Sequence, residues 1–519
     1  METGARENKS GIILKKLPYI IILLFSLICA EETIIGIIQF FKGLLTSNPY
    51  RITGSFVNTG TYGGFLSVCV SILIAYNNKN PINNKYLDKG IKTIIIITLL
   101  ILPSTMSRSA LLALGISITA LLLRIDRTRK VLIRILRIYG VYFFLFLGII
   151  CVGGYLIKKP SADVRFFMDK ICLRAIKTNN NLGAGIGNFG GEFGESQASF
   201  FKELIIQEGS NDLDWEVIDD DIRLIADCPS DPFNEYLFFG MELGPIIMTL
   251  FILFILLAMV ASYQRGTIWC YGLITFSVFA FFSNPLHFFV FQILFIFLMT
   301  ACFLDYETLD NKEQWKNRWL RLSGKVVLSS IVIVSSLTVF AKMDPDIYIS
   351  KDYKRSLSEW NESFFWFENE YYNYYVADCD NLLKYMNRND TFLFTYGQSL
   401  SKIGYFERSD SILKLGTRIS SDPMFWNVMG NNSLAQGKYR EAEERYKHAF
   451  YMVPNRLYPL VLLAKLYYAE GDTARFMKMT DVVENFVPKV ESIRTENLRA
   501  EIRELKKSYL SEIEEKNEN

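Results

Sequence analysis

Long apolar runs are the feature that most constrains this 519-residue chain. They recur through the first 341 residues and are absent afterwards. About 20 consecutive apolar residues cross a bilayer as a helix, because a helix satisfies every backbone polar group internally. The runs therefore predict an all-α, polytopic membrane domain over 1–341, with about nine spans at 17–45, 62–77, 91–104, 107–123, 138–157, 236–262, 268–283, 286–304 and 326–341.

The first predicted span contains an acidic pair. Glu31 and Glu32 follow Ala30 directly, and a run that ended there would be too short to cross a bilayer. We expect the helix to continue to about residue 45, with the acids at a break or facing the protein interior. A cleaved signal peptide is the alternative, although no small-residue cleavage site is clear.

Basic residues indicate the orientation of the spans. Lys and Arg concentrate in four segments outside the apolar runs, namely the N-terminus, 78–90, 124–137 and 305–325. Alternation of nine spans places all four on one side, which the positive charge identifies as cytoplasmic. The predicted topology is N-in, C-out. In a Gram-negative cell the protein would lie in the inner membrane, with periplasmic segments 46–61, 104–108, 158–235, 284–287 and 342–519.

A 34-residue period marks the soluble tail. Gly471 repeats Gly437, and Pro488 repeats Pro454 at the same spacing. Small residues let paired helices approach, and each Pro ends a second helix. The period predicts a tetratricopeptide-like solenoid, where we expect a protein partner or acceptor to dock. The predicted parts of the tail are a helical connector at 342–388, the repeats at 389–490, and a C-terminal helix with a charged tail at 491–519.

Composition argues against several kinds of site. A net charge of +2 gives no global field that would favour nucleic acid. His287 and His448 are the two histidines and there is no CxxC pair, so neither a metal site nor a cofactor is predicted. In an oxidising compartment Cys172 and Cys228 can form a disulfide, although spacing alone does not establish it.

Four segments on the predicted outer side carry a family resemblance. In chain order they are GSFVNTGTYGGFL at 54–66, STMSRSALLAL at 104–114, VRFFMDKICLRAIKTNNNLGAGIGNF at 164–189 and FNEYLFFGMELG at 233–244. Their order and positions resemble the O-antigen ligase and O-antigen polymerase superfamily of bacterial membrane glycosyltransferases. Some members carry tetratricopeptide tails. Members usually have more spans before the GSFVN segment than this chain has.

The resemblance implies transfer of a polyprenyl-diphosphate-linked glycan to a lipid or protein acceptor, or to another carrier-linked repeat, without a metal or a nucleotide sugar. A diphosphate leaving group needs cations at the headgroup level, and guanidinium binds phosphate through its planar fork. Arg108, between two spans, and Arg165, after the fifth span, are the expected diphosphate ligands. Interfacial anchoring is the alternative for Arg108. Arg174 is a further candidate on the same predicted helix as Arg165.

The glycine run NNNLGAGIGNFGG indicates a backbone turn. Gly183, Gly185 and Gly187 lack the GxGxxG spacing of a nucleotide loop, and no strand precedes them. We expect a tight turn that brings the backbone close to substrate or membrane. Asn58 is expected either to cap a helix or to bind sugar.

The usual proton acceptor is missing. Ligases of this family generally have His-Asn where this chain has Phe233 and Asn234, and an imidazole suits removal of the acceptor's proton. Glu235 and Asp231 are the nearest carboxylates, and His287, in the turn NPLHFF, is the third candidate base. For Glu235, charging or capping the start of the sixth span is the alternative role.

Two other functions fit parts of the sequence. A non-catalytic membrane scaffold that displays the repeat domain is favoured by Phe233 and by the few spans before GSFVN. A flippase or transporter tends to have paired repeats with polar residues at mid-membrane, whereas polar residues here gather at the outer boundary. Glu242, within the sixth span, is expected to pack against a polar partner.

Overall fold

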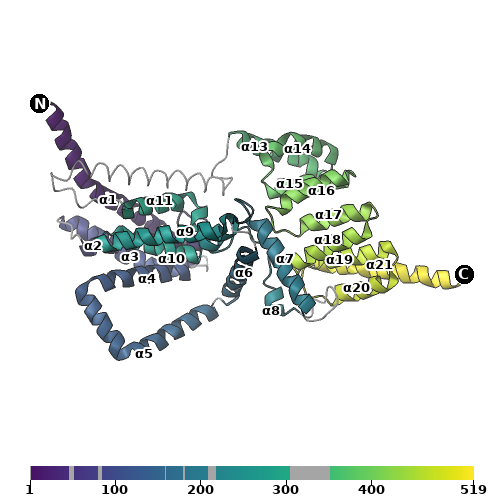
Figure 1. Ribbon diagram of the computed structural model, residues 1–519, viewed down its shortest axis with the longest axis horizontal. Coiled ribbons are helices and arrows are strands. Elements are labelled where there is room, and N and C mark those ends of the chain that lie inside the picture. Colours follow the sequence, from purple (N-terminus) through teal and green to yellow (C-terminus); the bar gives the residue numbers. More distant parts are fainter. Residues whose placement is uncertain are drawn as a thin grey trace. The chain divides into compact units, whose positions relative to one another are not determined.

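The computed structural model describes residues 2–45, 52–79, 84–157, 159–178, 182–207, 218–303 and 351–518 (Figure 1). Every regular element in these residues is a helix, as the sequence predicts. The chain divides into two compact units. Unit 1 comprises residues 1–158, 233–236 and 248–341, and unit 2 comprises residues 159–232, 237–247 and 342–519.

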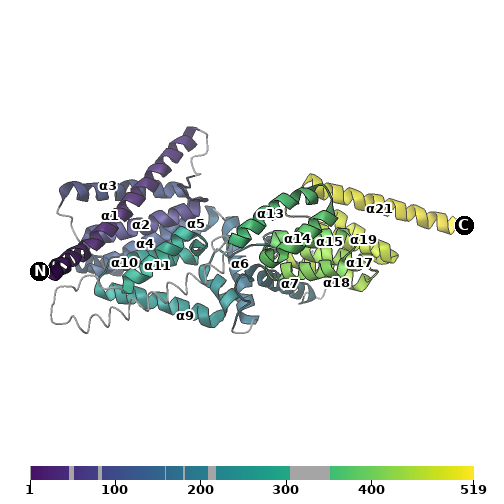
Figure 2. The same cartoon turned by 90° about the horizontal axis from the view of Figure 1, so that it is seen from above.

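Unit 1 contains the apolar helices. Their bounds are α1 Glu2–Leu45, α2 Thr59–Lys79, α3 Lys85–Ile101, η1 Leu102–Thr105, α4 Arg108–Arg124, α5 Asp126–Ile157, α9 Glu235–Arg265, α10 Trp269–Phe281, η3 Pro285–His287 and α11 Phe289–Phe303. Residues 237–247 of α9 belong to unit 2. α10 lies beside α2 and α4 (Figure 1, Figure 2). A Cβ on Gly272 would lie 2.7 Å from Ile72 Cγ1, so glycine permits the close approach of α2 and α10.

The helices match the predicted spans in position, but fewer are long enough to cross a membrane alone. A helix covers most of each predicted span except 326–341, which lies outside the described residues. α10 and α11 are apolar but have 13 and 15 residues. In the part of the chain that the structure describes, three helices are long and apolar enough to cross a membrane, namely Tyr19–Leu44, Thr59–Lys79 and Glu235–Arg265. The number is four if the bent pair Arg108–Arg124 and Asp126–Tyr142 forms a single span.

α1 continues through the acidic pair without a break, and Glu32 is turned into the protein interior. Glu32 is 8% exposed, and its carboxylate accepts hydrogen bonds from the N–H of Ser55 at 3.1 Å and from the Ser55 hydroxyl. Gln39 accepts the N–H of Gly54 at 2.8 Å and donates from Nε2 to the Gly54 carbonyl at 2.8 Å. These two side chains hold the GSFVN segment against α1.

The basic segment 124–137 is almost entirely helical. α4 ends at Arg124, Ile125 has extended backbone angles (φ −79°, ψ 114°), and α5 begins at Asp126. Arg108–Arg124 and Asp126–Tyr142 are bent from each other by 110° at this break. α5 then continues to Ile157, so the basic segment and the predicted fifth span form one helix.

Unit 2 contains a succession of paired helices, each packed against its neighbours in sequence (Figure 1). α13 Lys351–Glu368 and α14 Tyr372–Met386 occupy the predicted connector. Six helices of 12 to 14 residues follow: α15 Asp390–Lys402, α16 Phe406–Thr417, α17 Met424–Ala435, α18 Tyr439–Met452, α19 Tyr458–Glu470 and α20 Thr473–Asn485. α21 Ile493–Glu518 packs against α19 and α20 and includes most of the predicted charged tail.

The predicted outer loop is helical and shares a hydrophobic core with the tail. Its helices are α6 Lys159–Thr178, α7 Phe189–Gln207 and α8 Asp220–Arg223. Phe193 of α7 and Phe450 of α18 belong to the same cluster of buried side chains. A Cβ on Gly191 would lie 2.3 Å from the carbonyl oxygen of Arg418, so glycine lets α7 approach the tail backbone. Loop and tail therefore fold together as parts of unit 2.

Candidate functional site

Several predicted outer segments meet at one end of unit 1. A Cβ on Gly63, near the start of α2, would lie 2.8 Å from Thr105 Oγ1 in the turn before α4. Phe56 of the GSFVN segment packs on Phe291 near the start of α11, with ring centroids 6.0 Å apart. The start of α2, the start of α4 and the start of α11 therefore share this end, which we call the polar end of unit 1.

Arg108 is the first residue of α4 at the polar end. Its Nη1 donates a hydrogen bond to the carbonyl of Gly154 in α5 at 2.5 Å, and the residue is half-buried. This contact orients one edge of the guanidinium. A guanidinium carries five N–H donors in a planar fork, so an arginine held in this way can still present donors to an oxyanion.

Two of the candidate bases lie close together at the polar end. Glu235, the first residue of α9, is 1% exposed, and its Oε1 accepts the N–H of Leu286 at 2.5 Å. His287 follows Leu286 at the end of η3 and is half-buried. Gln292 donates to the carbonyl of Leu286 at 2.8 Å and so fixes the turn from the other side. The structure thus places a carboxylate and an imidazole at one turn.

The two candidate asparagines cap helices. Asn58 Oδ1 accepts the N–H of Thr61 at 2.8 Å at the start of α2, and Asn234 Oδ1 accepts the N–H of Tyr236 at 3.1 Å at the start of α9. Such caps satisfy N–H groups that have no partner within the helix. Of the two roles expected for Asn58, the structure shows the cap. Phe233, the residue before Asn234, is 42% exposed.

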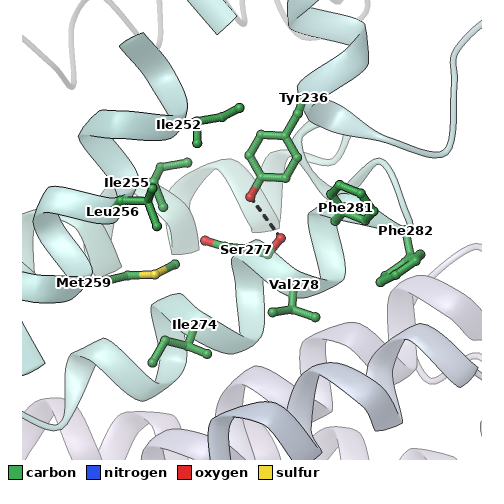
Figure 3. Close-up of a pocket in the computed structure, with 10 residues that line it drawn as sticks. All are labelled: Tyr236, Ile252, Ile255, Leu256, Met259, Ile274, Ser277, Val278, Phe281 and Phe282. Carbon is green, nitrogen blue, oxygen red and sulfur yellow. Dashed lines mark hydrogen bonds between the residues drawn. The ribbon is translucent and has the colours of Figure 1, made fainter. Parts of the chain in front are cut away.

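An apolar cavity of about 480 Å³ lies between α9 and α10, and its lining includes Tyr236, the residue after Glu235 (Figure 3). The Tyr236 hydroxyl donates to the carbonyl of Ser277 at 2.9 Å. Figure 3 shows aliphatic side chains of α9 on one side of this bond and two Phe rings on the other. The lining residues are Tyr236, Ile252, Ile255, Leu256, Met259, Ile274, Ser277, Val278, Phe281 and Phe282.

The glycine run forms a tight turn within unit 2. Gly183, Gly185 and Gly187 have φ values of +70°, +95° and +76°. The N–H of Gly185 donates to the carbonyl of Glu242 at 2.9 Å, and the Glu242 carboxylate accepts the N–H of Gly187 at 2.9 Å. The turn therefore lies against α9 where Gly244 breaks the helix (φ 87°, ψ 163°). Glu242 packs against polar backbone groups, as expected.

The other candidate residues lie in unit 2, whereas Arg108 lies in unit 1. Arg174 of α6 forms an ion pair with Glu203 of α7. The hydrogen bond from Arg174 lowers the pKa of Glu203, and the pair ties α6 to α7. Arg165 is half-buried on α6, and its role as a diphosphate ligand stays a prediction. Asp231, the remaining candidate base, accepts a hydrogen bond from the preceding serine hydroxyl at 3.1 Å.

Sequence reasoning missed the polar side chains that join the loop to the tail. Arg223 is fully buried, donates from Nη1 to the carbonyl of Val487 at 2.8 Å, and lies over the ring of Phe486 at 5.2 Å. Asn455 donates from Nδ2 to the carbonyls of Arg223 at 3.0 Å and Ala226 at 2.8 Å. No local pattern in the sequence distinguishes these residues from solvent-exposed ones.

The chain near Cys228 has perturbed acid–base properties. Burial raises the pKa of the Cys228 thiol to about 12, which keeps it protonated at neutral pH. Partial burial acts to raise the pKa of Asp227, but the hydrogen bonds from Lys489 at 2.9 Å and from the Cys228 N–H outweigh it and hold that pKa below its usual range. Cys172 and Cys228 are both free thiols, so the disulfide that the sequence allowed is not formed.

Among the described residues, no group of three or more His, Cys, Asp or Glu side chains is arranged to hold a metal ion. No protein-family model matches the chain, and no curated protein matches it. The functional assignment therefore depends on the residues of the polar end and on the cavity beside it.

Proposed function

We propose that this protein is a membrane glycosyltransferase that moves a polyprenyl-diphosphate-linked glycan to an acceptor at the outer face of the cytoplasmic membrane. The acceptor is a lipid, a protein or another carrier-linked glycan. The observation that supports this most is the position of Arg108, Glu235 and His287 at the polar end of unit 1. Transfer from a diphosphate needs a cation for the leaving group and a proton acceptor for the nucleophile.

In the proposed reaction, an acceptor hydroxyl attacks the anomeric carbon of the donor glycan. The new glycosidic C–O bond forms as the C–O bond to the diphosphate breaks, and the carrier diphosphate leaves with that electron pair. The hydroxyl proton passes to Glu235 or His287. Negative charge grows on the diphosphate during this step, so Arg108 would stabilise the transition state more than the ground state.

The apolar cavity beside Tyr236 supports a lipid-linked donor. Its volume of about 480 Å³ is within the range of small-molecule sites. Its lining is almost entirely hydrocarbon from α9 and α10, which suits an isoprenoid chain and would not suit a charged nucleotide. Tyr236 follows Glu235 directly, so a chain in this cavity would bring its head group near the candidate base.

We infer the N-in, C-out arrangement of about nine spans from the same helices. α4 and α9 begin at the polar end and finish with Arg124 and Arg265. Arg265 donates to the carbonyl of Cys302 near the end of α11, so α9 and α11 finish together. The positive-inside rule identifies that basic end as cytoplasmic, which turns the polar end towards the periplasm.

We infer that α15–α20 are tetratricopeptide-like repeats. Gly404, Gly437 and Gly471 follow successive first helices with φ values of +85°, +71° and +80°. A Cβ on Gly430 of α17 would lie 2.3 Å from the Tyr446 ring of α18, so small residues bring paired helices together as the period predicts. Because residues 159–232 already cover part of this domain, a protein partner would bind the remaining surface.

Replacing Arg108 tests the proposed activity. In proteoliposomes containing an undecaprenyl-diphosphate-linked oligosaccharide, Arg108→Ala should lower glycan transfer roughly 10²–10³-fold, the usual effect of losing one transition-state donor. Arg440→Ala is the matched control, because Arg440 is a surface arginine of α18 with a side chain 93% exposed. Arg108→Lys separates charge from folding: an unchanged thermal midpoint with partial activity is expected. Full activity of Arg108→Ala would disprove the role of Arg108.

The same assay identifies the proton acceptor. Glu235→Gln retains an oxygen that can accept the Leu286 N–H but cannot take up a proton at neutral pH. If Glu235 is the base, the maximal rate should fall by about 10²–10⁴-fold with little change in thermal midpoint. His287→Ala is the parallel test of the imidazole. Wild-type rates in both variants would remove these two residues as candidates.

A non-catalytic scaffold is the second candidate function. It is favoured by the shared core of the loop and the tail, which makes unit 2 a single folded body, and by the exposed Phe233 in place of the usual His. A scaffold predicts that Arg108→Ala and Glu235→Gln both support normal surface glycan in cells. An enzyme predicts that both fail at normal protein abundance.

A further inference from the structure

The first part of α5 has a strongly two-sided surface. Arg127, Lys130, Arg134 and Arg137 are spaced three or four residues apart, which places them on one face of the helix. All four are exposed. Within the described residues none of them forms an ion pair, whereas Arg129, which lies off this face, pairs with Asp126 at 2.6 Å. We call the four residues the basic face of α5.

A second face of the same turns is apolar. Val131, Ile135 and Tyr139 are 51%, 45% and 57% exposed. Leu132 and Leu136 lie next to Tyr139 on the helix surface and are half-buried. A helix with one cationic and one apolar face, both accessible, has the composition of helices that lie in the plane of a membrane interface.

The corner between α4 and α5 is fixed by specific contacts. Thr128 Oγ1, after the break, donates to the carbonyls of Leu122 in α4 at 2.6 Å and of Ile125 at the break at 2.9 Å. Arg124 donates to the carbonyl of Tyr263 and lies over its ring at 5.1 Å, which ties the corner to the end of α9. Hydrogen bonds and a cation–π contact within unit 1 therefore stabilise the 110° bend.

The bend decides the direction of the amphipathic segment. If α4 crosses the membrane, the segment Asp126–Tyr142, which is bent from α4 by 110°, runs almost parallel to the membrane surface. The corner lies at the basic end of unit 1, with Arg124 and Arg265. An apolar face can then rest on acyl chains while the basic face lies at the level of the phosphate groups.

We propose that the first part of α5 is an interfacial helix whose basic face binds the headgroups of anionic glycerophospholipids in the cytoplasmic leaflet. Four exposed cations that pair with no carboxylate of the described residues match a phosphate-rich surface. The apolar face favours a bilayer over a free anion as the ligand, because an anion alone would leave Val131, Ile135 and Tyr139 in water. The proposal requires that α4 spans the membrane, but it does not require glycan transfer.

Spin-labelled lipids measure this selectivity directly. The full chain is reconstituted in dioleoylphosphatidylcholine vesicles with trace spin-labelled phosphatidylglycerol or phosphatidylcholine, and electron paramagnetic resonance gives their relative association with the protein. The wild type should prefer phosphatidylglycerol. The preference should weaken at about 1 M salt, where the screening length is roughly 3 Å. Replacing Arg127, Lys130, Arg134 and Arg137 by Gln should abolish it, since each charge near the surface contributes about fivefold.

Two variants separate lipid binding from folding and net charge. Replacing the three arginines of the basic face by Lys keeps the charge and should keep the preference. Replacing four exposed lysines of residues 390–485 by Gln changes net charge equally and should also keep the preference; these are Lys402, Lys414, Lys438 and Lys478. The proposal would be overturned if the wild type showed no preference for phosphatidylglycerol, or if the four-Gln variant retained that preference. If the basic face binds an acidic protein instead of lipid, the wild type should show no preference. Glycan transfer is measured separately, so failure of either proposal is recognisable.

Discussion

Buried carboxylates in α9 are held by backbone N–H groups. Glu235 accepts the N–H of Leu286, and Glu242 accepts that of Gly187. A buried charge costs several kcal/mol unless it is matched by donors, so these contacts explain how an apolar helix can contain two acids. Their positions give them different roles. Glu235 lies beside His287 at the polar end, whereas Glu242 holds the glycine turn of unit 2.

The glycine turn gives a stability test with an internal control. A Cβ on Gly183 would lie 2.5 Å from the backbone nitrogen of Gly244, and its φ of +70° is unfavourable for alanine. Gly404 has a φ of +85° but no atom within 4 Å of its Cβ position. Gly404→Ala should therefore cost about 1–2 kcal/mol from backbone strain alone. Gly183→Ala should cost roughly 1–3 kcal/mol more from overpacking.

The measurement is the thermal midpoint of each full-length variant in detergent, together with protease sensitivity of residues 182–189. Gly183→Ala should show the lower midpoint and earlier cleavage in the turn. Equal midpoints for the two variants would show that the contact between the turn and α9 contributes nothing to stability.

Residue patterns predicted the local backbone structure better than they predicted which part of the chain it contacts. The spacing of Gly183, Gly185 and Gly187 indicated a tight turn, and all three have positive φ. The surface that this turn contacts is the backbone of α9, some sixty residues along the chain, which local sequence does not specify. For Asn58 the sequence left a cap and a sugar ligand open, and the hydrogen bond to Thr61 shows the cap.

At the scale of elements, hydrophobic runs located the helices but not their ends or bends. The predicted span at 236–262 corresponds to α9, yet Gly244 and Pro245 break its helical geometry near one end. The basic segment before 138 joins α5, because charged residues on one face do not stop a helix. Charge counts predicted the side of the membrane for this segment, whereas its direction depends on Ile125 and Thr128 at the corner.

The whole molecule combines two segments that are far apart in the chain. Residues 159–232 and the tail are separated by the apolar helices α9, α10 and α11, yet they share one core in unit 2. The sequence predicted a polar loop and a repeat solenoid as separate parts, because nothing local links Arg223 to Val487 or Asn455 to Ala226. Residues 159–232 therefore cover part of the tail surface, which the sequence predicted to bind a protein partner. Deleting the tail would consequently expose Phe193 and its neighbours, and would disturb the loop as well.

A single substitution tests this joint fold without deleting either part. Asn455 is 5% exposed and donates to the carbonyls of Arg223 and Ala226 from across the core. Asn455→Ala leaves those buried carbonyls without their donor, which should cost about 1–3 kcal/mol. Asn485 is the matched control, because it is exposed and its side chain donates to the carbonyl of Asp481 within the same helix. Limited proteolysis should cut residues 218–232 faster in Asn455→Ala than in Asn485→Ala, with a lower thermal midpoint. If cleavage accelerated only within α19 and α20, the substitution would weaken only these two helices, and the loop would not depend on the tail for its fold.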